Sequence, residues 1–189
     1  MTVRASTLER VHRAVLELVA DVGVPGLTME GVAARAGAGK QTIYRTWDSP
    51  LHVLLDALLA ASQDDRGRVH VPDTGDLAAD LRVVVDGIVA ELDDPSADVM
   101  MREVIALLPG QPELGEEVLD RLLRPQIAAI EERLAQGGVV EPGPAAELLL
   151  GPIFHRWLLR TGPFTADWAQ THVALVLRAL GEGSSVVQG

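Results

Sequence analysis

The sequence has 189 residues, a formal net charge of −11 at pH 7 and 48% hydrophobic residues. A chain of this length can bury one large core or two modest ones. Because it contains no cysteine, disulfide frameworks, cysteine-ligated zinc sites and thiol catalysis are excluded. A mean hydropathy of +0.19 is high, which indicates that some apolar surface meets a partner or a ligand, and dimerisation is the simplest explanation.

The charge is unevenly distributed along the chain. Residues 1–60 hold six basic and six acidic residues, whereas residues 61–189 hold ten basic and twenty-one acidic residues. DNA affinity comes largely from the neutralisation of phosphates. The acidic C-terminal part would therefore be repelled by DNA, and only the neutral N-terminal part is compatible with such a partner.

The sequence shows neither a secretory signal nor a membrane segment. Its first residues, MTVRASTLERVHR, carry charges where a signal peptide needs an apolar stretch. No apolar run reaches the roughly 18 residues of a transmembrane helix. We therefore expect a cytoplasmic protein with no membrane partner.

Two helices are predicted before residue 37. Ser6 and Glu9 form a capping box, and apolar residues then recur at helical spacing until Gly23. Thr28 is placed to cap a second helix. Gly37 is the expected stop, because glycine adopts the left-handed conformation that ends many helices.

A short third helix is predicted from Lys40 to Thr46. Ile43 and Trp47 are four residues apart and point into the small core, which leaves the polar residues of this helix on its other faces. Ser49-Pro50 then provides an N-cap and a first-turn proline for a fourth helix. A helix, a glycine turn and a second helix with a polar face outline a helix-turn-helix.

The rest of the chain also reads as helical. Residues 64–75 contain proline and glycine without helical periodicity, so we place a boundary there. Helices are expected at about 77–92, from 96 to about 108 with Ser96 as cap, at about 113–136 with a kink at Pro125, and at about 145–160 and 166–180. We predict an all-α fold with a DNA-binding domain at 1–50, a connecting helix at about 50–63, and a regulatory domain at 64–189.

The helix-turn-helix residues resemble those of the TetR family of bacterial transcriptional regulators over about a quarter of the chain. The matching residues are Thr28, Ala36-Gly37, Thr42-Ile43-Tyr44, Trp47 and Ser49. The resemblance implies an N-terminal three-helix DNA-binding domain plus a C-terminal helical domain for ligand binding and dimerisation. It implies a homodimeric regulator, usually a repressor, that binds a double-stranded DNA operator and is released by a small molecule.

The resemblance also assigns roles to individual residues. It places Thr28, Thr42 and Tyr44 on phosphates and Lys40 and Gln41 on base edges. The chemistry agrees, because lysine donates to guanine, glutamine bonds bidentately to adenine, and hydroxyls bind phosphates.

Two positions depart from the family pattern, and both predict weaker anchoring on DNA. Gly39 stands where a serine cap is usual, and Pro50 stands where a lysine is usual. Arg45, with Arg4 on the N-terminal arm, is expected to compensate by contacting phosphates. The alternative to a DNA-reading motif is an ordinary helical hairpin in a bundle. For Tyr44 alone, the alternative is a buried aromatic residue with a bonded hydroxyl.

An apolar ligand pocket and a dimer interface are expected in the C-terminal part. The candidate pocket residues are Met100, Met101, Ile105, Phe154, Trp157 and Trp168, with His155 or Arg156 as a polar anchor. The candidate dimer residues on the last two helices are Leu149, Ile153, Val173, Val176, Leu177 and Leu180. Packed core or dimer interface is the alternative explanation for each pocket residue, since methionine, for example, also fills gaps in cores.

No catalytic or metal-binding motif is present in the sequence. The five histidines show no spacing typical of a metal site, and no nucleophile, phosphate-binding or dinucleotide-binding motif occurs. We therefore expect no enzyme activity, no cofactor and no metal. Two other classes of protein remain as alternatives: a helical protein-interaction module whose helix-turn-helix no longer binds DNA, and a small all-α enzyme.

Overall fold

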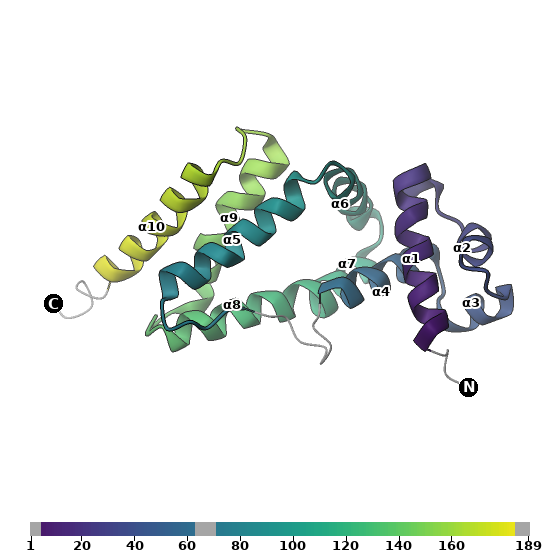
Figure 1. Ribbon diagram of the computed structural model, residues 1–189, viewed down its shortest axis with the longest axis horizontal. Coiled ribbons are helices and arrows are strands. Elements are labelled where there is room, and N and C mark those ends of the chain that lie inside the picture. Colours follow the sequence, from purple (N-terminus) through teal and green to yellow (C-terminus); the bar gives the residue numbers. More distant parts are fainter. Residues whose placement is uncertain (1–4, 63–70, 184–189) are drawn as a thin grey trace. The chain divides into compact units, whose positions relative to one another are not determined.

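The structure is a computed structural model that describes residues 5–62 and 71–183 (Figure 1). Over these ranges it is helical with no strand, which confirms the all-α prediction. Three single-turn elements occur between the helices: η1 (Val24–Gly26), η2 (Leu108–Gly110) and the π-helix η3 (Leu119–Leu123). The helices are α1 (Ala5–Val22), α2 (Met29–Ala36), α3 (Lys40–Thr46), α4 (Pro50–Ser62), α5 (Leu77–Asp93), α6 (Pro95–Leu107), α7 (Pro112–Val118), α8 (Arg124–Gln136), α9 (Pro142–Leu159) and α10 (Ala166–Gly183).

The described residues form two compact units. The first consists of residues 5–62 together with 98–123, and the second of residues 71–97 together with 124–183. The chain therefore leaves the first unit, returns to it through most of α6 with α7 and η3, and leaves it again. The domains expected at 1–50 and 64–189 follow chain order rather than packing, and that assignment stays a prediction.

The beginnings and ends of the N-terminal helices follow from single residues. The Thr28 hydroxyl accepts a hydrogen bond from the Gly31 amide at 3.0 Å and caps α2, and Gly37 ends this helix in the left-handed conformation with φ 59°. The Ser49 hydroxyl accepts from the His52 amide at 3.3 Å at the start of α4. The expected cap at Ser6 is wrong, because Ser6 already lies inside α1.

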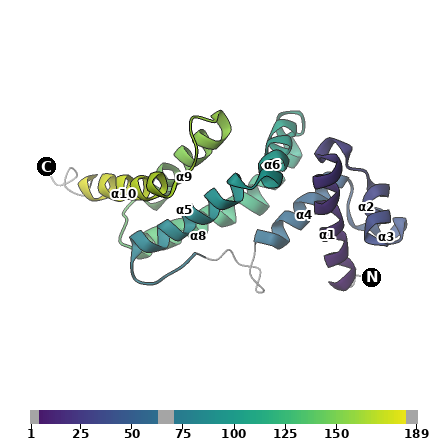
Figure 2. The same ribbon diagram turned by 45° about the horizontal axis from the view of Figure 1, so that its top comes forward.

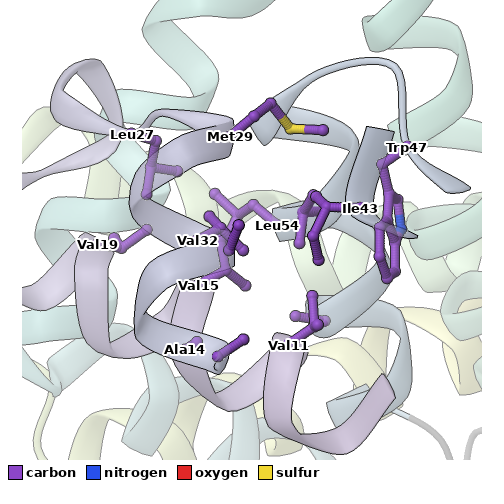
Figure 3. Close-up of a cluster of buried hydrophobic side chains, with 14 of the residues drawn as sticks. Val11, Ala14, Val15, Val19, Leu27, Met29, Val32, Ile43, Trp47 and Leu54 are labelled. Carbon is purple, nitrogen blue, oxygen red and sulfur yellow. The ribbon is translucent and has the colours of Figure 1, made fainter. Parts of the chain in front are cut away.

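The core of the first unit is built from α1 to α4 (Figure 3). Val11, Val15, Val32 and Ile43 are fully buried in it, and α1, α2 and α3 each contribute one or more of them. Truncating a buried aliphatic side chain of this kind to alanine costs about 2–5 kcal/mol. The orientation of α3 is therefore held by the packing of its inner face.

Most of α6, with α7 and η3, packs against this N-terminal core. Met100, Val104 and Leu107 are partly buried against it. The Glu103 carboxylate accepts a hydrogen bond of 2.7 Å from the Val24 amide in η1. Leu114 of α7 joins a second small cluster with residues of α4. The helix-turn-helix is thus supported by chain that follows it by more than forty residues.

Two details of this segment correct the sequence-based expectations. Asp94, not Ser96, caps α6, because its side chain accepts from the amides of Ser96 and Ala97 at 3.0 and 2.9 Å. The single helix expected at 113–136 is instead α7 and α8 joined by the π-helix η3. The irregularity directly precedes Pro125, which lacks the N–H needed to continue regular α-helical bonding.

The second unit contains α5, α8, α9 and α10. α10 packs against both α5 and α9, and α9 packs against α8 (Figures 1 and 2). Arg133 on α8 donates to the Asp80 carboxylate on α5 through Nε at 2.9 Å and Nη2 at 2.6 Å. The amide and hydroxyl of Thr74 also donate to Asp80. This fully buried carboxylate is therefore satisfied on several sides.

Candidate DNA-binding site

The turn between α2 and α3 is closed by backbone bonds around Gly37. The Gly37 amide donates to the Ala34 carbonyl at 3.2 Å, and the Ala38 amide donates to the Ala33 carbonyl at 3.0 Å. A positive φ at Gly37 is costly for any residue with a Cβ. The chain then enters α3 at Gly39, which makes no side-chain cap.

The residues of α3 and its C-cap Trp47 fall into a buried pair, one half-buried residue and an exposed set. Ile43 and the capping residue Trp47 are 0% and 4% exposed. Thr42 is half-buried. The exposed residues of this helix are Lys40, Gln41, Tyr44, Arg45 and Thr46. Two apolar side chains thus fix the helix, while donors suited to base edges and phosphates face outward.

Tyr44 is not the buried aromatic residue of the alternative interpretation. Its side chain is 49% exposed, and its hydroxyl donates a 2.7 Å hydrogen bond to Oε1 of Glu30 in the first turn of α2. This bond raises the pKa of Tyr44 and lowers the pKa of Glu30, and the Lys40 charge lowers the latter further. Sequence reasoning missed this partner of Tyr44.

Several basic residues of the N-terminal helices are engaged within the protein. Arg35 pairs with Asp21 at 2.7 Å and with Glu17 at 3.5 Å. The Arg10 guanidinium donates to the Ala36 carbonyl at 3.3 Å, which fastens α1 to the end of α2. Lys40 and Arg45 are therefore the exposed cations that α3 itself presents. Arg4, the proposed supplementary cation, lies outside the described residues.

A polar network connects the end of α3 to α4 and η3. Trp47 Nε1 donates to Oδ2 of Asp56 at 3.0 Å, and Arg121 Nη2 donates to Oδ1 of the same carboxylate at 2.9 Å. His12 Nε2 lies 4.0 Å from Asp56. Burial lowers the pKa of His12, and Asp56 only partly opposes the change, so His12 is neutral near pH 7.

The network continues to the start of α4. Arg121 also pairs with Glu117 on α7, and Glu117 lies 3.3 Å from Nε2 of His52. His52 Nδ1 is 3.2 Å from the hydroxyl of Ser49, the cap of α4. The first two turns of α4 are thus linked to the α7–η3 segment at His52 and at Asp56. The end of α3 is linked to the same segment because Trp47 donates to Asp56.

The candidate pocket residues fall in both compact units. Met100, Met101 and Ile105 are half-buried residues of α6 in the first unit. The remaining three lie in the second unit, where Trp157 is buried, Phe154 is 39% exposed and Trp168 is half-buried. Phe154 and Trp157 meet edge to face, with ring centroids 6.5 Å apart. The pocket stays a prediction.

Trp168 lies in a cluster of stacked groups within the second unit. The ring of His172 stacks on it at 5.1 Å, and the Arg156 guanidinium lies 5.0 Å from its centroid. Phe164 meets its edge at 5.3 Å. Nε2 of His172 lies 2.7 Å from the Leu149 carbonyl on α9. These contacts hold α9, α10 and their connection together.

The candidate dimer residues are mostly covered by their own chain. Leu149, Ile153, Val173 and Val176 are between 0% and 4% exposed, and Leu177 and Leu180 are half-buried. Covered side chains leave little surface for a second subunit. The exposed apolar residues of these helices are instead Leu148, Phe154, Leu158, Leu159 and Leu175. The interface assignment stays a prediction.

Neither a metal centre nor a membrane span is found in the part of the chain that the structure describes. Over residues 5–62 and 71–183, no group of three or more histidine or acidic side chains is arranged to hold a metal ion. Within the same residues, no helix combines the length and apolarity needed to cross a bilayer. The outer face of α3 and the start of α2, with the glycine turn between these helices, form the surface of a helix-turn-helix DNA-binding protein.

Comparison with known proteins identifies the family within this class. The family model described as "Tetracyclin repressor-like, C-terminal domain" matches residues 71–176, and the model described as "Bacterial regulatory proteins, tetR family" matches residues 13–50. YdeS, an HTH-type transcriptional regulator of Bacillus subtilis strain 168, is 29% identical over 176 residues, which cover 84% of this chain and 83% of YdeS.

Solved structures show the same fold. The TetR family transcription regulator SCO0332 is 25% identical with a TM-score of 0.74, over 90% of this chain and 96% of that one. The flavonoid-responsive regulator FrrA is 19% identical with a TM-score of 0.69, over 95% of this chain and 97% of that one. The chain belongs to the TetR family: it is a helix-turn-helix transcriptional regulator and not an enzyme.

Proposed function

We propose that the protein is a homodimeric repressor that binds a palindromic operator and is released by a small apolar or amphipathic molecule. The observation that carries the proposal is the division of α3, in which Ile43 and Trp47 are buried while Lys40, Gln41 and Tyr44 are exposed. Any surface helix has a polar outer face, so the weight lies on the kind of groups that α3 presents, which are donors suited to base edges and phosphates. Its site of action would be the cytoplasm, where the operator is.

We assign base reading to Lys40 and Gln41, and positioning on phosphates to Thr28, Thr42, Tyr44 and Arg45. The Thr28 oxygen accepts from the Gly31 amide, so its hydroxyl proton is available for a phosphate oxygen. Lys40 and Gln41 begin α3, and base contacts in helix-turn-helix proteins come from the N-terminal residues of the second helix.

A dimer is supported by an exposed apolar stripe on α9. Leu148, Gly151, Pro152 and Leu159 recur at helical spacing on one side of this helix. All four are exposed, as is His155, which lies between them on the same side. On α10, Leu175 is 49% exposed. Small residues between larger apolar ones allow two helices to approach closely. A second copy of the chain would cover this stripe and place two reader helices on successive major grooves of a palindrome.

Regulation by a small molecule is supported by the course of the chain. α6, α7 and η3 follow α5 and precede α8, yet most of this segment packs with the helix-turn-helix. A molecule that prefers one arrangement of the second unit's helices would shift this segment and the reader with it. FrrA, a fold neighbour, is described as flavonoid-responsive, which makes aromatic molecules sensible first candidates.

Selection from a pool of random duplexes tests this function directly. The wild-type protein should enrich an inverted repeat whose half-sites are about one helical turn apart, centre to centre. Lys40→Ala should relax the preference at one base of each half-site by about 1–3 kcal/mol, and Tyr44→Phe should weaken binding to all duplexes about equally. Failure to enrich any sequence would contradict the proposal and favour a protein-interaction module.

A further inference from the structure

Glu30 is a carboxylate on the face that we propose meets DNA. It lies in the first turn of α2, two residues after the cap Thr28, and is exposed. Its Oε1 accepts the 2.7 Å hydrogen bond from the Tyr44 hydroxyl. The Glu30 side chain thus engages the hydroxyl proton of Tyr44, which we propose binds a DNA phosphate, and places a negative charge beside it.

The geometry makes the carboxylate and a phosphate mutually exclusive partners. A tyrosine hydroxyl has one proton to donate, and its bond to an ionised carboxylate is among the stronger hydrogen bonds. The hydroxyl must leave Glu30 before it can donate to DNA. The carboxylate then loses its donor and lies close to a second anion, which is unfavourable for both charges.

We propose that Glu30 is a positioning residue that competes with the DNA backbone for the Tyr44 hydroxyl and so lowers the affinity of the reader for every duplex. This inference rests on the proposed function and deepens it. Lys40 also interacts with Glu30, because its positive charge lowers the pKa of the Glu30 carboxyl group. Binding then depends more heavily on the base contacts of Lys40 and Gln41, which only an operator satisfies.

A purely structural role for Glu30 makes a different prediction. An acidic residue in the first turn of a helix stabilises it through the helix dipole by about 0.3–1 kcal/mol. If that were its whole role, Glu30→Gln would slightly lower stability and leave DNA affinity unchanged. Glu113, an exposed glutamate in the first turn of α7, provides a matched control, since Glu113→Gln makes the same chemical change outside the helix-turn-helix.

The contact itself can be tested without DNA, because Tyr44 is the sole tyrosine in the sequence. Its ionisation can be followed in the intact protein by tyrosinate absorbance or by the resonance of carbon-13 at Cζ. Glu30 raises the pKa of Tyr44 through the hydrogen bond. Glu30→Gln should therefore lower this pKa toward its ordinary value, whereas Glu113→Gln should not. An unchanged pKa in Glu30→Gln would overturn the inference.

The competition is tested by fluorescence anisotropy at fixed ionic strength, with the selected duplex and a scrambled duplex of equal length. Glu30→Gln should tighten binding to both by about tenfold, and Glu113→Gln should leave both unchanged. Tyr44→Phe should weaken binding several-fold more in combination with Glu30→Gln than alone, because the hydroxyl is then free of its competitor. Thermal unfolding of each variant confirms that it is folded.

Besides an unchanged pKa of Tyr44, three binding results would overturn the inference while leaving the proposed function intact. The first is an affinity that Glu30→Gln leaves unchanged, as a purely structural role predicts. If Glu30→Gln weakened binding, Glu30 would be preparing Tyr44 for the phosphate rather than competing for it. If the gain from Glu30→Gln were the same with and without Tyr44→Phe, the effect would be charge repulsion alone. Absence of duplex binding by the wild-type protein would instead overturn the proposed function, and the inference with it.

Discussion

Two charged contacts, one in each compact unit, differ sharply in burial. In the second unit, Asp80 and Arg133 are 0% and 5% exposed and satisfied by partners within the chain. In the first unit, the bond between Tyr44 and Glu30 lies at the surface, where a ligand can replace either partner. A buried pair fixes one arrangement of helices and therefore suits support. An exposed pair can exchange its partners and therefore suits recognition.

The largest expected effect would come from breaking the buried pair. Arg133→Ala leaves the Asp80 carboxylate buried without its cation and should lower the melting temperature by roughly 10 °C. Arg35→Ala, which removes an exposed pairing with Asp21, should change it by no more than about 2 °C. Differential scanning calorimetry measures both. Equal shifts would show that burial does not distinguish the pairs.

The same pair predicts how stability depends on pH. Burial alone would raise the pKa of Asp80, but hydrogen bonds from Thr74 and Arg133 outweigh it, so the pKa lies below its ordinary value of 3.8. A lowered folded-state pKa stabilises the protein above the unfolded-state value, and that stabilisation is lost as the pH falls through the folded-state value. Urea unfolding should therefore show a loss of stability below about pH 4 that is smaller in Asp80→Asn.

A further prediction asks whether the second unit offers a surface that a second copy of the chain can cover. Leu159 is 61% exposed on the apolar stripe of α9, so Leu159→Asp should convert the proposed dimer into a monomer without unfolding it. Val140→Asp is the control, because Val140 is 84% exposed in the connection before α9. Sedimentation velocity distinguishes the two variants. A dimer that survives Leu159→Asp would place the interface elsewhere.

Another prediction concerns the network that joins Trp47 to Arg121, which is intermediate in exposure between the Asp80–Arg133 and Tyr44–Glu30 contacts. Arg121 is half-exposed, yet it shares the Asp56 carboxylate with the Trp47 indole. Arg121→Ala should weaken binding to the selected duplex about fivefold with little change in melting temperature, since partly exposed pairs contribute little stability. Trp47→Phe removes the indole donor from the same carboxylate and should act in the same direction. Fluorescence anisotropy measures both, and unchanged affinity would show that the network is structural only.

The smallest effect is expected at the turn that separates α2 from α3. Nothing lies within 4 Å of a Cβ built on Gly37, but its φ is +59°. Gly37→Ala should therefore cost about 1 kcal/mol of unfolding free energy through backbone strain alone. Gly37→Asn should cost less, because asparagine tolerates this conformation better. Denaturant unfolding tests the order of the two variants.

Local features of the fold were predictable because they depend on neighbouring residues. Thr28 as cap, Gly37 as stop and the inward pair of Ile43 and Trp47 follow from spacing and turn chemistry, and the structure confirms each of them. The expected cap of α6 was wrong, because Asp94 and not Ser96 accepts the hydrogen bonds at the start of this helix. Both can cap a helix, and only the backbone path decides between them.

Contacts between distant residues were not predictable. Asp56 and Arg121 are 65 positions apart and meet only because the chain returns to the first unit. Apolar residues lie on several sides of α9, as the run Leu148, Leu149 and Leu150 shows, and periodicity alone does not say which side faces its own chain. For that reason the sequence does not separate core from interface at Leu149 and Ile153, which are expected at a dimer interface and are fully buried within their own chain.

The internal engagement of Arg35 and Arg10 also bears on how the protein would search for its operator. Weak, sequence-independent binding to DNA and sliding along it depend on cations that displace counterions from phosphates. Within residues 5–62, Arg35 pairs with two carboxylates and Arg10 donates to a carbonyl, so the exposed cations left for phosphates there are Arg13, Lys40 and Arg45. We expect a shallow dependence of affinity on salt and short visits to non-operator DNA. Such a protein would find its target by repeated encounters from solution rather than by long one-dimensional tracking.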